Sequence, residues 1–291
     1  MKMGIRYMVL LAALCGLSTA QGFDLKQDLK KKLEEAKQKV QPAETPSDAA
    51  APSEAQALLA DFSVDEEIKI GRQIAGNLLG ASPLVPDEAL QVYVNKVGRW
   101  VASQSERPDL AWHFGVIESA DINAFAIPGG YVFLTRGLYQ RLRNEAELAG
   151  VLAHEVAHVT RKHHLKILQK SKLLDIGAKA LGRQAGEHDR LRNLIGSGAE
   201  VMARSLDKDA EYEADRMGVV LAGRAGYDPF GLPVVLQQVG QVKKDDTAVA
   251  LLFKTHPHPD ARLGQLDLAI GQRFDDLSGP TLESRLYRLR P

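Results

Sequence analysis

The sequence feature that most constrains this chain is a pair of histidines four residues apart, His154 and His158, with Glu155 directly after the first. Residues four apart lie on one face of an α-helix, so both imidazoles can bind a single zinc ion. Glu155 lies about 100° further round the same helix and can face a water molecule on that metal. The pattern therefore predicts two metal ligands and a general base on one helix.

The residues around the pair favour this interpretation over its main alternative, a buried helix with two hydrogen-bonded histidines and an unrelated glutamate. Asn144 can cap the helix, and Glu147 falls at the third helical position as its capping-box partner. Residues 148–153 are apolar nearly all round, as in a buried central helix. Two imidazoles and a carboxylate in such surroundings need partners, and a metal supplies them.

A third ligand is expected elsewhere in the chain, because a catalytic zinc ion usually has three protein ligands and one open position. Residues 208–221 are predicted to form a helix that carries two candidates, Glu211 and Glu213. Glu211 shares a helix face with Asp215, whereas Glu213 points about 200° away from Glu211. A carboxylate one turn behind a ligand can orient the metal site. The spacing therefore favours Glu211 on the metal and Asp215 behind it, and the alternative is an exposed acidic face.

Taken together, these motifs resemble those of the zinc endopeptidases related to HtpX and the CAAX prenyl protease. The resemblance extends to residues 123–132 and to Thr255-His256-Pro257, and it covers most of residues 60–272. It points to the soluble periplasmic, BepA-like branch, here without a tetratricopeptide repeat domain. One departure is the Asp207-Lys208 pair, where the family often has Ser-Arg. Lysine cannot make the forked hydrogen bonds of arginine.

The family resemblance also implies a role for each residue of the two motifs. In that family the two motif histidines and the first glutamate of the later motif bind zinc. These positions correspond to His154, His158 and Glu211. The resemblance further implies that Glu155 is the general base that activates a zinc-bound water, and that Asp215 is a supporting catalytic residue.

A further catalytic candidate, His256, lies in the segment Thr255-His256-Pro257-His258-Pro259. Each residue before a proline is pushed toward an extended conformation, so this segment is predicted to be a non-helical loop. Such a loop could place the His256 imidazole over the metal. We consider two roles for it: an oxyanion donor, or a ligand that occupies the open zinc position and keeps the enzyme latent. His258 and the pair His163-His164 are expected at loop and helix-end positions, where histidine is ordinary.

The N-terminus has the pattern of a signal peptide at residues 1–20. Lys2 and Arg6 precede an apolar run at residues 7–17, and small residues follow it. The run is too short for a permanent membrane helix. We therefore expect export, most simply to a bacterial periplasm. Lipoprotein anchoring through Cys15 is less favoured, because Leu14 is a poor residue at the position before a modified cysteine.

The rest of the chain divides into two parts. Residues 21–56 read as a charged helix followed by a flexible linker, and residues 57–291 as the metalloprotease domain. Charges interrupt every hydrophobic run beyond residue 20, so no transmembrane segment is expected after signal removal. The chain has 37 Lys and Arg against 37 Asp and Glu, and this balance does not indicate nucleic-acid binding.

The expected fold is α+β: a mainly helical gluzincin-type metalloprotease domain with a small β-sheet packed on the zinc-binding helix. Helical patterns cover residues 64–79 and 86–103, residues 112–118 alternate as a strand, and residues 124–135 read as a hairpin-like pair. Helices are predicted to dominate from there to residue 271. Residues 124–127 are the candidate edge strand that would hold an extended substrate, and an ordinary buried strand is the alternative.

The leading functional hypothesis is a zinc-dependent endopeptidase with one zinc ion per chain. The resemblance implies unfolded or misassembled envelope proteins as substrates, with the outer-membrane assembly machinery as a possible partner. A second hypothesis is a chaperone-like quality-control factor with a latent or low-turnover zinc site. A third is a structural zinc protein, in which Glu155 would have no role.

Overall fold

The computed structural model describes residues 61–169, 206–243, 245–274 and 278–289. The predicted signal peptide and the predicted charged helix and linker lie outside the described residues. Within these ranges, no helix combines the length and the apolar character that crossing a membrane requires. The described residues confirm the predicted α+β class, because many helices surround one small sheet.

The sheet has three strands, β1 (His113–Ile117), β2 (Ala124–Ile127) and β3 (Tyr131–Thr135). The spatial order is β1-β3-β2, with β1 parallel and β2 antiparallel to the central strand β3. The hairpin-like pair predicted over residues 124–135 is therefore confirmed. Among the described strands β2 pairs with β3 alone, so β2 lies at an edge of the sheet.

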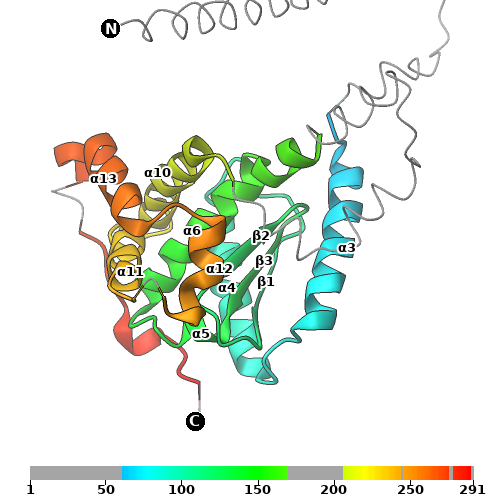
Figure 1. Ribbon diagram of the computed structural model, residues 1–291, viewed down its shortest axis with the longest axis horizontal. Helices are drawn as coiled ribbons and strands as arrows, with labels where there is room; N and C mark the ends of the chain where they lie inside the picture. Colours follow the sequence, from blue (N-terminus) through cyan, green and yellow to red (C-terminus); the bar gives the residue numbers. More distant parts are fainter. Residues whose placement is uncertain (1–60, 170–205, 244, 275–277, 290–291) are drawn as a thin grey trace, which may run out of the picture. The chain divides into compact units, whose positions relative to one another are not determined.

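Alternating side chains divide the strands into two apolar faces. Phe125, Ile127 and Phe133 pack with residues of α3 (Val64–Ala81) on one face. The residues between them, such as Ala126 and Leu134, belong to the main core, which includes α4 (Glu88–Ala102) and α6 (Glu145–Thr160). Figure 1 shows α3 on one side of the strands and α6 on the other. The predicted sheet packed on the histidine-bearing helix is confirmed.

Helix α6 is the centre of this arrangement, and all of its residues are buried. Asn144 caps it as predicted, because its side-chain oxygen accepts a hydrogen bond from the Glu147 backbone N–H at 2.8 Å. The predicted capping box is modified. The Glu147 carboxylate accepts from the backbone N–H of Arg143, one residue before the cap, at 2.8 Å. The N-terminal end of α6 is thus tied to the preceding loop as well as to its own cap.

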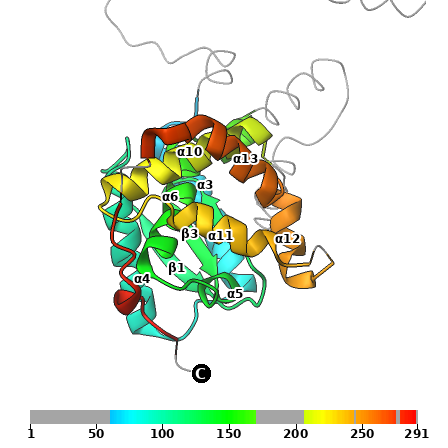
Figure 2. The same cartoon turned by 90° about the vertical axis from the view of Figure 1, so that its left-hand side faces the viewer.

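A second layer of helices covers the other side of α6. It contains α10 (Lys208–Arg224) and α11 (Gly231–Gly240), which both pack on α6, and then α12 (Thr247–Thr255) and α13 (Pro259–Ile270). Figure 2 views this layer directly. Short segments complete the described fold, namely α5 (Arg136–Tyr139), η1 (Gly271–Phe274) and η2 (Glu283–Arg285).

The contact between α10 and α6 is close because a glycine lies at the crossing. A Cβ atom built on Gly218 would lie 3.1 Å from the backbone nitrogen of His154. The absence of a side chain therefore lets the two helix backbones approach each other. This approach brings the acidic residues of α10 within reach of the histidines of α6.

Candidate metal centre and active site

Helix α6 places the two motif histidines against each other, as the four-residue spacing predicts. The Nε2 atoms of His154 and His158 lie 3.0 Å apart, and both side chains are buried. Their Nδ1 atoms point the other way, toward Asp215 at 3.0 Å and His163 at 2.9 Å respectively. Each ring is therefore oriented from behind, with one nitrogen of each directed at a common point.

Helix α10 brings Glu211, and not Glu213, to the same point. The Glu211 carboxylate oxygens lie 3.5 Å from His158 Nε2 and 3.8 Å from His154 Nε2. Glu213 instead contacts Arg161 at 3.1 Å and His163 at 3.3 Å. The convergence of two separate helices on which the sequence interpretation depends is thus present in the structure.

The donor set at this point fits a zinc ion. Ligand atoms from His154, His158, Glu211 and His256 all lie within 4.8 Å of one another. One carboxylate oxygen of the fully buried Glu211 side chain has no hydrogen-bond partner among the described residues. Burying an unpaired carboxylate oxygen costs free energy unless a cation binds it. Two imidazoles and one carboxylate are also the ligands of many catalytic zinc sites.

A buried arginine that the sequence analysis missed, Arg262, joins this cluster from α13. Its Nε and Nη2 donate to the two carboxylate oxygens of Asp215 at 2.9 and 2.5 Å. Asp215 also faces His154 Nδ1 at 3.0 Å. Burial alone would raise the pKa of Asp215, but the guanidinium and the histidine hold this pKa well below its ordinary value. Asp215 is therefore a fixed anion that can orient His154, the position predicted for it.

His256 lies beside Glu211, and its Nδ1 is 2.7 Å from a Glu211 carboxylate oxygen. Its backbone is extended, with φ −121° and ψ 150°, as the following proline requires. The predicted loop is shorter than expected, because Thr255 ends α12 and Pro259 begins α13. Proline suits the first position of a helix, where its missing N–H costs nothing. The structure thus brings His256 to the metal-binding group and keeps His258 at a helix cap.

The electrostatics of the cluster keep Glu211 ionised. Burial works to raise the pKa of Glu211, but His256 and His158 outweigh it and hold this pKa well below its usual range. Burial raises the pKa of Glu155, against the opposing effect of His154 and His256. Burial lowers the pKa of His158 well below its ordinary value. The imidazole of His158 is therefore held neutral, the form that binds a metal.

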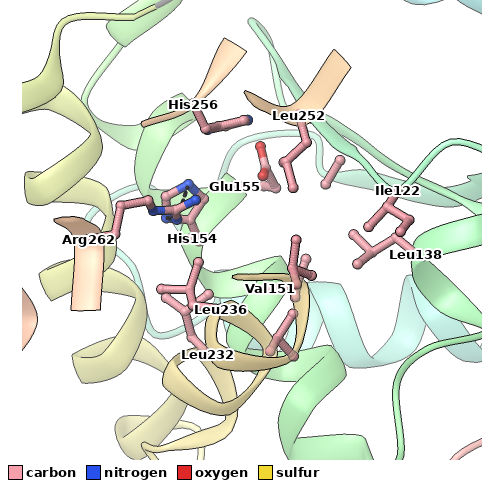
Figure 3. Close-up of a pocket in the computed structure, with 13 residues that line it drawn as sticks. Ile122, Leu138, Val151, His154, Glu155, Leu232, Leu236, Leu252, His256 and Arg262 are labelled. Atoms are coloured by element: carbon pink, nitrogen blue, oxygen red, sulfur yellow. Dashed lines mark hydrogen bonds between the residues drawn. The ribbon is translucent and has the colours of Figure 1, made fainter. Parts of the chain in front are cut away.

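Glu155 faces an apolar cavity of about 50 Å³ beside the cluster. Figure 3 shows its carboxylate between His256 and Leu252, with His154 and Arg262 at one side of the cavity. The other lining side chains are apolar and come from α5, α6, α11, α12, the start of β2 and the segment before β2: Ile122, Ala124, Leu138, Val151, Leu232, Val235, Leu236, Val239 and Leu252. A carboxylate at the mouth of an apolar cavity can serve as a base where water access is restricted.

A smaller hollow of about 10 Å³ lies along the edge strand. Residues of β2, Glu155 and His256 line it, and so does Asn123, the residue before the strand. Both amide atoms of the buried Asn123 side chain are without a hydrogen-bond partner in the described part of the chain. In the sequence, Asn123 stands out only as the first residue of the segment 123–132 that shares the family resemblance. An amide with both groups unsatisfied is a site where a bound backbone can complete the hydrogen bonds.

His163 also differs from its expected ordinary position. The structure places its buried ring against His158, with the two Nδ1 atoms 2.9 Å apart. His164 contacts the His158 ring at a centroid distance of 6.1 Å and also lines the hollow that Glu155 and His256 share. The sequence signal for His163 was limited to its place just beyond the histidine-bearing helix.

Known proteins are similar to this chain over the region that contains the metal centre. The sequence profile of peptidase family M48 matches residues 88–269. The chain is 31% identical over 212 residues to the beta-barrel assembly-enhancing protease of Yersinia pestis, covering 70% of this chain and 44% of that protein. It is also 31% identical over 210 residues to the protein of the same name from Escherichia coli strain K12, covering 69% and 43%.

A more distant similarity is to the mitochondrial metalloendopeptidase OMA1 of Arabidopsis thaliana. Here the identity is 27% over 175 residues, which cover 60% of this chain and 35% of that protein. The chain thus spans less than half the length of these curated relatives. The matched region contains both helices that form the metal centre.

Proposed function

The chain belongs to peptidase family M48, and from this premise we propose that it is a zinc-dependent endopeptidase acting on unfolded or misassembled proteins of the bacterial envelope. The membership confirms the family resemblance and the enzyme class, a metalloprotease. One observation carries the proposal. His154, His158 and Glu211 converge from two helices beside Glu155, which faces a cavity.

The proposed roles follow from where each group lies. His154, His158 and Glu211 would hold the zinc ion, which when bound supplies a Lewis acid and lowers the pKa of water toward neutrality. Glu155 takes the proton of the attacking water and passes it to the departing amine. Asp215 and Arg262 hold the His154 ring in place.

The substrate is proposed to bind as an extended segment along β2. This strand lies at the edge of the sheet and lines the hollow that Glu155 and His256 share. Pairing with a strand edge uses the substrate backbone, so it reads sequence only loosely. The buried amide of Asn123 would add a donor and an acceptor to this pairing.

The apolar cavity beside Glu155 is proposed to receive one side chain of the substrate. Nine of its thirteen lining residues are aliphatic, so burial of an apolar side chain against them is favourable by about 25 cal/mol per Å². Segments that expose aliphatic side chains are typical of unfolded or misassembled proteins. This preference supports the proposed substrate class.

Cellular location and partners are proposed from the sequence and the relatives together. The signal-peptide pattern of residues 1–20 predicts export. The relatives from Yersinia pestis and Escherichia coli are named for beta-barrel assembly. We therefore propose a periplasmic location, with the outer-membrane assembly machinery as the candidate partner.

The alternative is a chaperone-like factor with a latent zinc site, and the position of His256 supports this alternative. His256 Nδ1 lies 2.7 Å from Glu211, within the metal-binding group. A histidine there can bind the metal in place of water, or it can donate a hydrogen bond to the developing oxyanion. Substitution of His256 separates these two roles, because it should speed cleavage in the first case and slow it in the second.

Glu155→Gln tests the proposed function. This variant keeps the shape and the volume of the side chain but removes the base. We expect unchanged zinc content and at least a 100-fold loss of cleavage of an unfolded test protein such as casein. Full biological activity of Glu155→Gln in cells that lack the parent protein would contradict the peptidase proposal and favour the chaperone-like alternative.

A further inference from the structure

A chain of two hydrogen bonds runs behind the second metal-facing histidine. His158 Nδ1 lies 2.9 Å from His163 Nδ1, and His163 Nε2 lies 3.3 Å from a carboxylate oxygen of Glu213. His158 and His163 are 1% and 4% exposed, so water does not compete for the hydrogen bond between their two rings. Resting on the zinc site proposed above, we infer that His163, held by Glu213, positions His158 for metal binding.

The proton positions along this chain follow from which atom of His158 faces the metal. Its Nε2 is directed at His154 and Glu211 and must keep a free lone pair to bind the metal. The proton of the neutral ring is therefore on Nδ1, which donates to His163 Nδ1. Since that nitrogen accepts, the proton of His163 is on Nε2 and donates to Glu213. Every ring nitrogen has one role, and the two bonds run in one direction.

The backbone between the two histidines is shaped to allow this contact. Helix α6 ends at Thr160, and Lys162 has a φ of 56°, in the left-handed region. Residues 163–169 then form a second helical segment. A left-handed lysine costs about 1 kcal/mol or more, and such positions persist where surrounding contacts compensate. The turn places His163 beside His158, five residues earlier.

Glu213 is in turn held in place by Arg161. The Arg161 Nε lies 3.1 Å from one Glu213 oxygen, and the other oxygen faces His163. Arg161 Nη1 also pairs with Glu106 at 3.0 Å. The Glu213 side chain is 37% exposed, so its own contribution is screened by water and smaller than that of His163.

The two histidines of α6 are thus both oriented from α10. Asp215 contacts His154 directly, and Glu213 reaches His158 through His163. Hydrogen bonds of this kind fix the tautomer and the orientation of a metal-binding imidazole, and their loss typically lowers metal affinity about 10- to 100-fold. Glu213, which the sequence analysis weighed as a ligand, receives a different role: it anchors the residue behind a ligand.

The experiment compares zinc affinities of the full chain by competition with a chelator. His163→Phe keeps a buried ring but removes both nitrogens, and we expect its zinc affinity to fall about 10-fold or more. Glu213→Gln should lower it less. Glu106→Gln is the matched control, because it also removes an Arg161 ion pair but does not touch His163. Its affinity should stay within about twofold of the parent, since exposed ion pairs contribute little.

The double variant His163→Phe/Glu213→Gln gives the sharpest comparison. If Glu213 acts only through His163, the double variant binds zinc as weakly as His163→Phe alone, so the two effects are not additive. The melting temperature of the metal-free proteins shows whether His163→Phe is folded. If His163→Phe is not folded, two other measurements provide the test. These are the zinc affinity of Glu213→Gln and the ring-nitrogen NMR signals of the zinc-loaded parent, which should show an Nε2–H tautomer for His163.

The outcomes separate this inference from the proposed function. If the parent binds no zinc, both are wrong. If the parent binds zinc and folded His163→Phe binds it with equal affinity, only the positioning role is wrong. Additive losses in the double variant, or an Nδ1–H tautomer for His163 in the zinc-loaded parent, would likewise overturn the positioning role while leaving the zinc site in place.

Discussion

The ion pair between Arg262 and Asp215 offers a prediction that depends on the structure alone. Arg262 is 4% and Asp215 1% exposed, and two hydrogen bonds join them. Arg262→Met removes the cation but leaves the buried carboxylate with His154 as its remaining partner. Removing one partner of a buried pair typically costs about 3–5 kcal/mol. We expect the free energy of unfolding to fall by this amount.

The assay is urea unfolding of the chelator-treated protein, followed by circular dichroism. Arg136→Met is the control, because Arg136 forms a half-exposed ion pair with Glu118 and should cost less than about 1 kcal/mol. In Arg262→Met/Asp215→Asn the unpaired charge is absent, so the double variant should cost less than the sum of the single changes.

The pH dependence of the unfolding free energy provides a second, independent test of the Arg262–Asp215 ion pair. In the parent, Arg262 holds the pKa of Asp215 below its ordinary value, so the pair stabilises the fold above the unfolded pKa of about 3.9 and is lost only at lower pH. In Arg262→Met, burial should raise this pKa, because the main opposing charge is gone. The deficit of the variant relative to the parent should therefore shrink as the pH falls. Additive costs, or a loss in Arg262→Met no larger than in Arg136→Met, would refute the reasoning.

Three further predictions concern the packing, the loop and the metal. Gly150→Ala should destabilise the fold by about 1–3 kcal/mol, because its Cβ would lie 2.5 Å from the backbone nitrogen of Leu232. The control Gly76→Ala, at an exposed and open helix position, should be neutral or stabilising. Equal melting temperatures of the two variants would contradict the predicted clash at Gly150. His256→Ala should cleave casein faster if His256 keeps the enzyme latent and slower if it supports the oxyanion; an unchanged rate and zinc content would end both hypotheses. Zinc at about 100 times its dissociation constant should stabilise the parent by about 2.7 kcal/mol in thermal unfolding, and no shift relative to chelator would contradict a site present in the folded state.

The parts of the site that could be predicted from the sequence are pairs of residues close together on one helix. His154 and His158 share a helix face because they are four residues apart, and Glu211 and Asp215 do so for the same reason. The apolar surroundings of α6 identified it as a central helix. Each helix could therefore be predicted with its active face, and the family resemblance supplied the link between them.

The parts that the sequence did not predict depend on contacts between distant segments. Arg262 reaches Asp215 across 47 residues, and nothing in the local pattern of α13 distinguishes it from a solvated arginine. His163 contacts His158 only because Lys162 adopts a left-handed conformation, and no glycine or asparagine marks that turn. The parallel pairing of β1 with β3 is equally non-local, since a strand pattern does not specify its partner.

The central claim is that two helices hold one zinc ion through His154, His158 and Glu211. The most direct measurement is anomalous diffraction at the zinc absorption edge from crystals of the zinc-loaded full chain. We expect one peak, about 2.0–2.2 Å from the Nε2 atoms of both histidines and from a Glu211 carboxylate oxygen. A zinc peak elsewhere, or a Glu211 side chain directed away from the two imidazoles, would contradict it.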